Sequence, residues 1–142
     1  MDNKTIAIKM VDYASTLLGL SDIEVFFKSG DFFPHKDVNS MFIDNYYAVV
    51  FNEEWLETAN YAEIFVASLH ETRHAYQKAN IDFPEFFIGR ESKETIEKWK
   101  ANFENYIKPN GENDKHYLDQ AIEKDAIEYS KKIMKQEFKL KV

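Results

Sequence analysis

The chain has 142 residues, of which 44% are hydrophobic, 15% aromatic and 30% charged, and none is cysteine. That length suits one domain with its own core, and the lack of cysteine excludes disulfide scaffolds, thiolate zinc sites and cysteine nucleophiles. The formal net charge of −7 opposes nucleic-acid binding, because a phosphate backbone repels an acidic surface. We therefore expect a single domain over residues 1–142 that does not bind nucleic acid.

Glycine and proline residues divide the chain into a series of expected elements. The first half is expected to form a helix over residues 4–18, a strand over 23–27, a loop over 29–40, a short strand over 41–43, a turn at 44–45 and a strand over 46–51. The second half is expected to form a short helix from 52 or 53 to 56, a helix over 61–78, an apolar loop over 82–89, a helix over 92–106, a break at 109–111 and a final helix from 114 or 117 to 138. A helix followed by strands and then by helices is typical of an α+β fold. We expect a small antiparallel sheet of about three strands packed on helices.

The sequence indicates neither a signal peptide nor a membrane-spanning segment. Residues 1–4 lead into an amphipathic segment, and the apolar runs are far shorter than the roughly 20 residues that span a bilayer. We therefore expect a cytoplasmic protein without a membrane partner. The sequence does not indicate its oligomeric state.

Residues 70–74 read His-Glu-Thr-Arg-His, which is the pattern H-E-x-x-H. On the expected helix, His70 and His74 lie on one face, so both imidazoles can reach the same ion. Neutral imidazole is a good zinc ligand, and Glu71 is placed to take a proton from a zinc-activated water as general base. The pattern predicts a Zn²⁺ site that serves hydrolysis. Arg73 either pairs with a carboxylate of the last helix or is a surface residue.

Such a zinc site needs a third protein ligand. The longer metzincin pattern H-E-x-x-H-x-x-G-x-x-H is excluded, because Gln77 and Asn80 stand where that pattern has glycine and the third histidine. On the last expected helix, Asp119 and Glu123 lie along one edge of the apolar stripe, so helix geometry allows either of them. The downstream candidates are His116, Asp119, Glu123, Asp125 and Glu128.

Residues 123–130 read Glu-Lys-Asp-Ala-Ile-Glu-Tyr-Ser. Together with H-E-x-x-H, this segment resembles the second motif of gluzincin-type zinc metallopeptidases, in particular the small ImmA/IrrE-like peptidases of phages and mobile elements. The resemblance implies a zincin-like fold, a Zn²⁺ cofactor, Glu123 as third zinc ligand and a peptide or protein substrate. The sequence departs from that family at Ile127, where many relatives have an Asp or Asn that orients a zinc-bound histidine. We expect that orienting partner to be Asp119, Asp125 or a backbone carbonyl.

Zincins also suggest roles for residues around the metal. They often place a Tyr or His near the third ligand to hydrogen-bond the developing oxyanion, so Tyr117 and His116 are candidates, with packing and a loop position as the alternatives. The resemblance implies an edge strand above the site that pairs with extended substrate, and the strand over 46–51 would supply it. The three phenylalanines of the loop 82–89 are expected to form a core patch rather than a specificity pocket.

Two other functions fit the same residues. A non-catalytic zincin-fold module would bind the metal and act by recognising a protein partner, although Glu71 argues against it because a structural metal site needs no general base. An acidic α+β interaction protein would bind no metal at all. Metal content separates this last interpretation from the other two.

Overall fold

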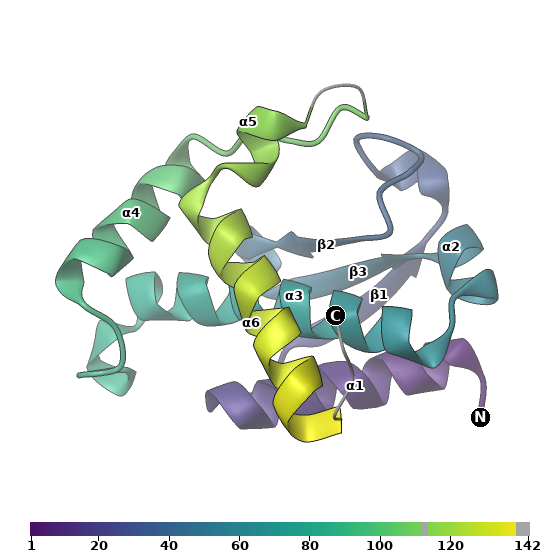
Figure 1. Cartoon of the computed structure of the whole chain (residues 1–142), viewed down its shortest axis with the longest axis horizontal. Coiled ribbons are helices and arrows are strands. Elements are labelled where there is room, and N and C mark those ends of the chain that lie inside the picture. The colour runs from purple at the N-terminus through teal and green to yellow at the C-terminus, as the bar shows by residue number, and fades with distance from the viewer. Residues whose placement is uncertain (112–113, 139–142) are drawn as a thin grey trace.

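The structure is a computed structural model that describes residues 1–111 and 114–138. Within these residues the chain forms six α-helices and one three-stranded sheet, an α+β arrangement that confirms the predicted class. In chain order these are α1 (Asn3–Leu18), β1 (Glu24–Lys28), β2 (Ser40–Ile43), β3 (Ala48–Asn52), α2 (Glu53–Thr58), α3 (Tyr61–Asp82), α4 (Lys93–Glu104), α5 (Lys115–Leu118) and α6 (Ala121–Phe138). Figure 1 shows α3 in front of the sheet, with α1 below it and α6 running across it.

Local hydrogen bonds explain where α1 and α3 begin and end. The Asp2 carboxylate accepts a hydrogen bond from the backbone N–H of Thr5 at 2.7 Å and caps α1, which ends at Gly19 in the left-handed conformation, with φ of +73°. Asn60 and Glu63 form a reciprocal capping box at the start of α3. The helix α3 extends beyond the predicted end at residue 78, up to the residue preceding Phe83 and Pro84, where the proline disfavours further helix.

The sheet is mixed, so the predicted all-antiparallel sheet is wrong. The strand order is β1-β3-β2: β2 pairs antiparallel with β3, whereas β1 pairs parallel with β3, with Glu24 opposite Ala48. The short connection from β2 to β3 makes a hairpin, which must be antiparallel. The longer segment 29–39 carries the chain past the β3 position, so β3 returns between the other two strands and runs in the direction of β1.

The strand β3 is therefore central, and all five of its residues are buried. The expectation that residues 46–51 form the edge strand is wrong, because β2 lies at one edge of the sheet and β1 at the other. Uniform burial of β3 follows from its position between two strands and against α1, α2 and α3, whose side chains form one apolar cluster with Val49 and Phe51.

The predicted final helix is two helices. α5 ends at Leu118 and α6 begins at Ala121, and the side chain of Gln120 lies at the break. Its amide nitrogen donates to the carbonyl of Ile107 at 3.0 Å, and its amide oxygen accepts from the N–H of the same residue at 2.9 Å. This pairing fastens the segment after α4 to the start of α6. None of the helices in the described ranges is long and apolar enough to cross a membrane.

Candidate metal centre

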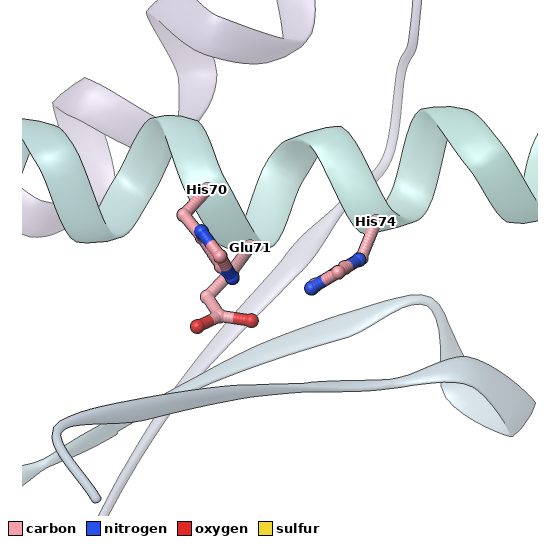
Figure 2. A group of neighbouring side chains, drawn as sticks. All are labelled: His70, Glu71 and His74. Carbon is pink, nitrogen blue, oxygen red and sulfur yellow. The ribbon is translucent and has the colours of Figure 1, made fainter. Parts of the chain in front are cut away.

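The H-E-x-x-H residues lie in the middle of α3, as predicted. His70, Glu71 and His74 each offer a ligand atom, and these atoms lie within 4.8 Å of one another, so the group could hold a metal ion. Figure 2 shows the three side chains leaving α3 on the same side, toward the strands beneath it. On another side of α3, the fully buried Leu69 packs with Ala14 of α1 and Met134 of α6, which fixes the direction in which the imidazoles point.

Glu123 reaches the two histidines from the first turn of α6. Its Oε1 lies 3.0 Å from Nε2 of His70 and its Oε2 lies 3.1 Å from Nε2 of His74, and the side chain is buried completely. A tetrahedral ion with ligands at about 2.0–2.2 Å holds neighbouring ligand atoms about 3.3–3.6 Å apart. Each imidazole nitrogen would therefore need to move only a few tenths of an ångström away from the Glu123 oxygen that faces it, and this donor set fits a metal ion.

Burial and charge act against each other at this cluster. Burial alone would lower the pKa of His74, but the attraction of Glu123 outweighs it and raises that pKa to about 9. Burial would likewise raise the pKa of Glu123, but the hydrogen bonds and charge of His74 and His70 hold it well below its usual range. Without a metal, the carboxylate therefore stays ionised and His74 protonated at neutral pH.

The other predicted candidates for the third ligand lie elsewhere. Asp125 accepts two hydrogen bonds from the guanidinium of Arg73, at 2.7 and 3.1 Å, so of the two alternatives left open for Arg73 the structure has the pair with the last helix. Asp119 is exposed and lies 4.0 Å from the ammonium of Lys124. His116 and Glu128 are exposed as well. Of the five candidates, only Glu123 is in contact with the histidines among the described residues.

Gln77, a residue that sequence reasoning used only to exclude metzincins, contacts one of the histidines. Its side-chain oxygen lies 2.8 Å from Nδ1 of His74, and the side chain is fully buried. This is the contact expected of the orienting partner, for which Asp119, Asp125 or a backbone carbonyl was predicted. Its position three residues after His74, on the same helix face, was the signal that could have identified it.

Glu71 faces a strand and a set of clefts. Its Oε2 accepts a hydrogen bond from the hydroxyl of Ser40 at 2.8 Å, at the start of β2. A cleft of about 340 Å³ runs from here along β2 toward Asp44, and it is also lined by His74 and Glu123. Two further clefts, toward Asp37 and toward Trp55, also include both Ser40 and Glu71 in their walls. The three clefts thus meet at Ser40 and Glu71, beside the metal centre.

Two tyrosines form the opposite wall of the main cleft. Tyr117 lines it as expected, whereas His116 lies on the exposed side of α5 and is not among the residues that line these clefts. Tyr106, which sequence reasoning did not single out, donates a hydrogen bond from its hydroxyl to Oε2 of Glu123 at 2.9 Å, and its ring meets that of Tyr117 edge to face. Burial, and then the charge of Glu123, raises the pKa of both phenols, so both remain protonated donors.

The free edge of β2 faces the main cleft. The N–H of Asn52 donates to the carbonyl of Asn39 at 2.9 Å, so Asn39 is in a hydrogen-bonded pair across the hairpin. Because these pairs alternate in an antiparallel ladder, Met41 directs its backbone groups at β3, while Ser40 and Phe42 direct theirs outward. Both of these residues line the main cleft.

The loop after α3 lies apart from the site. Phe87 is buried with Tyr76 and Trp99, but Phe83 and Phe86 are 44% and 75% exposed, so only part of the expected core patch forms. None of these phenylalanines lines the clefts at the metal centre.

A comparison of the chain with protein-family models, with curated proteins and with solved structures finds no match. The interpretation of the site therefore depends on the residues and their geometry.

Proposed function

We propose that the protein is a zinc-dependent metallopeptidase, with His70, His74 and Glu123 as the metal ligands and Glu71 as the general base. The observation that carries the proposal is the meeting of the Glu123 carboxylate with both imidazole nitrogens, at 3.0 and 3.1 Å. Two imidazole nitrogens and one carboxylate oxygen are a donor set found in catalytic zinc sites. A bound zinc ion would supply a Lewis acid and an acidified water.

In this mechanism Glu71 would transfer a proton rather than bind the ion. One of its carboxylate oxygens accepts from Ser40, so the side chain is held at the junction of the clefts. There it would take the proton of the attacking water and return it to the amine that leaves. Tyr117 lines the cleft as a protonated donor, and it would hydrogen-bond the carbonyl oxygen of the substrate as negative charge develops on it. Tyr106 donates its one hydroxyl proton to Glu123, so it would hold that ligand instead.

The shape of the site favours an extended peptide as substrate. The outward backbone groups of Ser40 and Phe42 can pair with a strand added at the edge of β2, because main-chain pairing of this kind binds extended segments. Clefts lie on both sides of Glu71, one toward Asp44 and one toward Trp55. A peptide in this groove would therefore continue on both sides of the scissile bond.

The test is hydrolysis of an unfolded, fluorophore-labelled protein by the zinc-loaded chain, compared with its Glu71→Gln variant. Glu71→Gln should abolish turnover, while elemental analysis should still find one zinc per chain, because Glu71 is not a ligand. Glu128→Gln, at an exposed glutamate of α6, is the matched control and should be as active as the wild type. Full activity of Glu71→Gln would contradict this mechanism. A zinc-loaded wild type that hydrolyses no peptide bond would instead support a binding module.

A further inference from the structure

Gln77 connects the metal centre to a buried ion pair. Its side-chain nitrogen donates to the carbonyl of Ile122 at 3.0 Å and to Oδ2 of Asp125 at 2.8 Å, and its oxygen faces Nδ1 of His74 at 2.8 Å. The side chain is fully buried, so water does not compete for these bonds. One amide thus joins the H-E-x-x-H helix to both the backbone and a side chain of α6.

The chemistry of the partners fixes which way this amide points. A backbone carbonyl and an ionised carboxylate can only accept hydrogen bonds, so both require the NH₂ group of Gln77. The oxygen must then face His74, and an oxygen can only accept. The Nδ1 atom of His74 must therefore carry a proton.

From this geometry we propose that Gln77 is a positioning residue that holds His74 as the Nδ1–H form, so that the lone pair of Nε2 faces the metal. The proposal depends on the metal-binding part of the proposed function and not on peptidase activity. The peptidases that the sequence resembles often orient a zinc-bound histidine from the position that Ile127 occupies here. In this chain the orienting group would lie on α3 instead, three residues after His74.

Arg73 and Asp125 hold the amide in place. Arg73 binds Asp125 through two hydrogen bonds, at 2.7 and 3.1 Å, and its guanidinium carbon lies 4.5 Å from the ring centre of Tyr76 and 4.6 Å from that of Tyr129. The carboxylate is thereby fixed against α3, and a reversed Gln77 amide would set two oxygens against each other. We expect Arg73 and Asp125 to act on the metal centre through Gln77.

The experiment measures Zn²⁺ affinity by competition with a chelator and the thermal unfolding of the metal-free protein, for two variants that separate positioning from packing. Gln77→Met keeps the volume of the side chain but cannot accept from His74. It should bind zinc about 10- to 100-fold more weakly, which is the usual effect of removing a partner that orients a ligand. Gln77→Glu can still accept from the Nδ1–H of His74, so it should keep near-wild-type affinity. It loses both donors to α6 and faces Asp125, so it should unfold at a lower temperature.

Asn80→Leu is the matched control, because Asn80 is another fully buried amide of α3 whose hydrogen bonds go to Tyr76 and not to a histidine. It should leave zinc affinity unchanged whatever it does to stability. Asp125→Asn tests whether Asp125 acts through Gln77, and it should weaken zinc binding by less than Gln77→Met does. The proposal is overturned if Gln77→Met binds zinc as tightly as the wild type, or if zinc affinity simply follows stability through Gln77→Met, Gln77→Glu and Asn80→Leu.

These outcomes separate the proposal from the proposed function. A chain that binds zinc with the predicted dependence on Gln77 but cleaves no peptide would refute the peptidase and keep the positioning role. A chain that cleaves peptides while Gln77→Met retains full zinc affinity would support the peptidase and refute the positioning role of Gln77.

Discussion

The helix α3 packs against two other helices in different ways. Along α1 the contact is apolar: Met10 and Val11 share a core cluster with Ile64, and Ala14 packs with Leu69. Along the first half of α6 the contact is polar and charged, through His70, His74 and Gln77 of α3 and through Glu123 and Asp125 of α6. The same helix therefore has an apolar interface that holds the fold together and a charged interface that forms the candidate metal centre.

The two interfaces differ in what their burial costs. Apolar side chains gain free energy when they leave water, whereas a buried carboxylate such as Glu123 loses its hydration and is tolerable only with partners. Each buried charge on the α6 side has such partners: Glu123 has two imidazoles and Tyr106, and Arg73 has Asp125. The α1 interface thus stabilises the fold by apolar burial, whereas the α6 interface does so only while its charges keep their partners.

The largest effect should come from removing the α6 carboxylate. Glu123→Ala should abolish stoichiometric zinc binding, with a loss well beyond the roughly 10- to 100-fold caused by removing a residue that only supports a ligand. Elemental analysis of the purified wild type should give one zinc per chain. Asp119→Ala, at an exposed carboxylate just before α6, is the control and should keep its zinc. If Glu123→Ala retained its zinc, or Asp119→Ala lost it, the assignment of Glu123 as the third ligand would be wrong.

Much of the α1 interface, and the pair of histidines at the metal centre, could be predicted from the sequence. Periodicity and capping residues locate α1 and α3, and H-E-x-x-H places His70 and His74 on one helix face, because these features depend on local geometry. The alternation of the strands did not reveal that β1 runs parallel to β3, because which strand lies in the centre depends on the path of the segment 29–39. The break at Gln120 was missed for a related reason, since its partner is the distant backbone of Ile107.

The α6 side of the site was predictable only in part. Helix geometry left both Asp119 and Glu123 open, and a resemblance rather than the spacing selected Glu123. Tyr106 and Ser40 have no local pattern that marks them. They reach the site because the segment after α4 and the strand β2 fold back over α3, and such tertiary contacts leave no periodic signal in the sequence.

A substitution on the α1 side should change the stability of the fold and leave zinc affinity unchanged. Ile64→Ala removes a fully buried side chain from the cluster shared with α1 and should lower the free energy of unfolding by about 2–5 kcal/mol. Zinc affinity, measured on the folded protein, should not change. Urea unfolding of the metal-free protein gives the first quantity and chelator competition the second. A zinc affinity that falls with stability in Ile64→Ala would mean that the two interfaces do not act separately.

Only the α6 side should make stability depend on pH near neutrality. The pKa of His74 is raised from 6.5 to about 9 in the folded, metal-free protein, so its contribution is complete below pH 6.5 and is lost as the pH rises through 9. Chelator-treated wild type should lose on the order of 2–3 kcal/mol of unfolding free energy between pH 6.5 and 9. Ile64→Ala should show the same slope at lower stability.

Glu123→Gln provides the control for this pH dependence, because the neutral amide removes the charge that raises the pKa of His74. Its unfolding free energy should vary much less between pH 6.5 and 9 than that of the wild type. An equal slope in both proteins would place the responsible group outside the metal centre.

The smallest effect should come from the end of α1, far from the charged interface. Asp2→Ala removes the carboxylate that accepts from the N–H of Thr5 and should lower the free energy of unfolding by about 0.5–2 kcal/mol, as loss of an N-cap does. Asp2→Asn should recover most of this loss, because Asn caps helices almost as well as Asp. Neither variant should alter zinc affinity or the pH slope, since the cap contacts only the first turn of α1. A change in zinc affinity for Asp2→Ala without the same change for Ile64→Ala would show that α1 affects the metal centre by a route other than the shared apolar cluster.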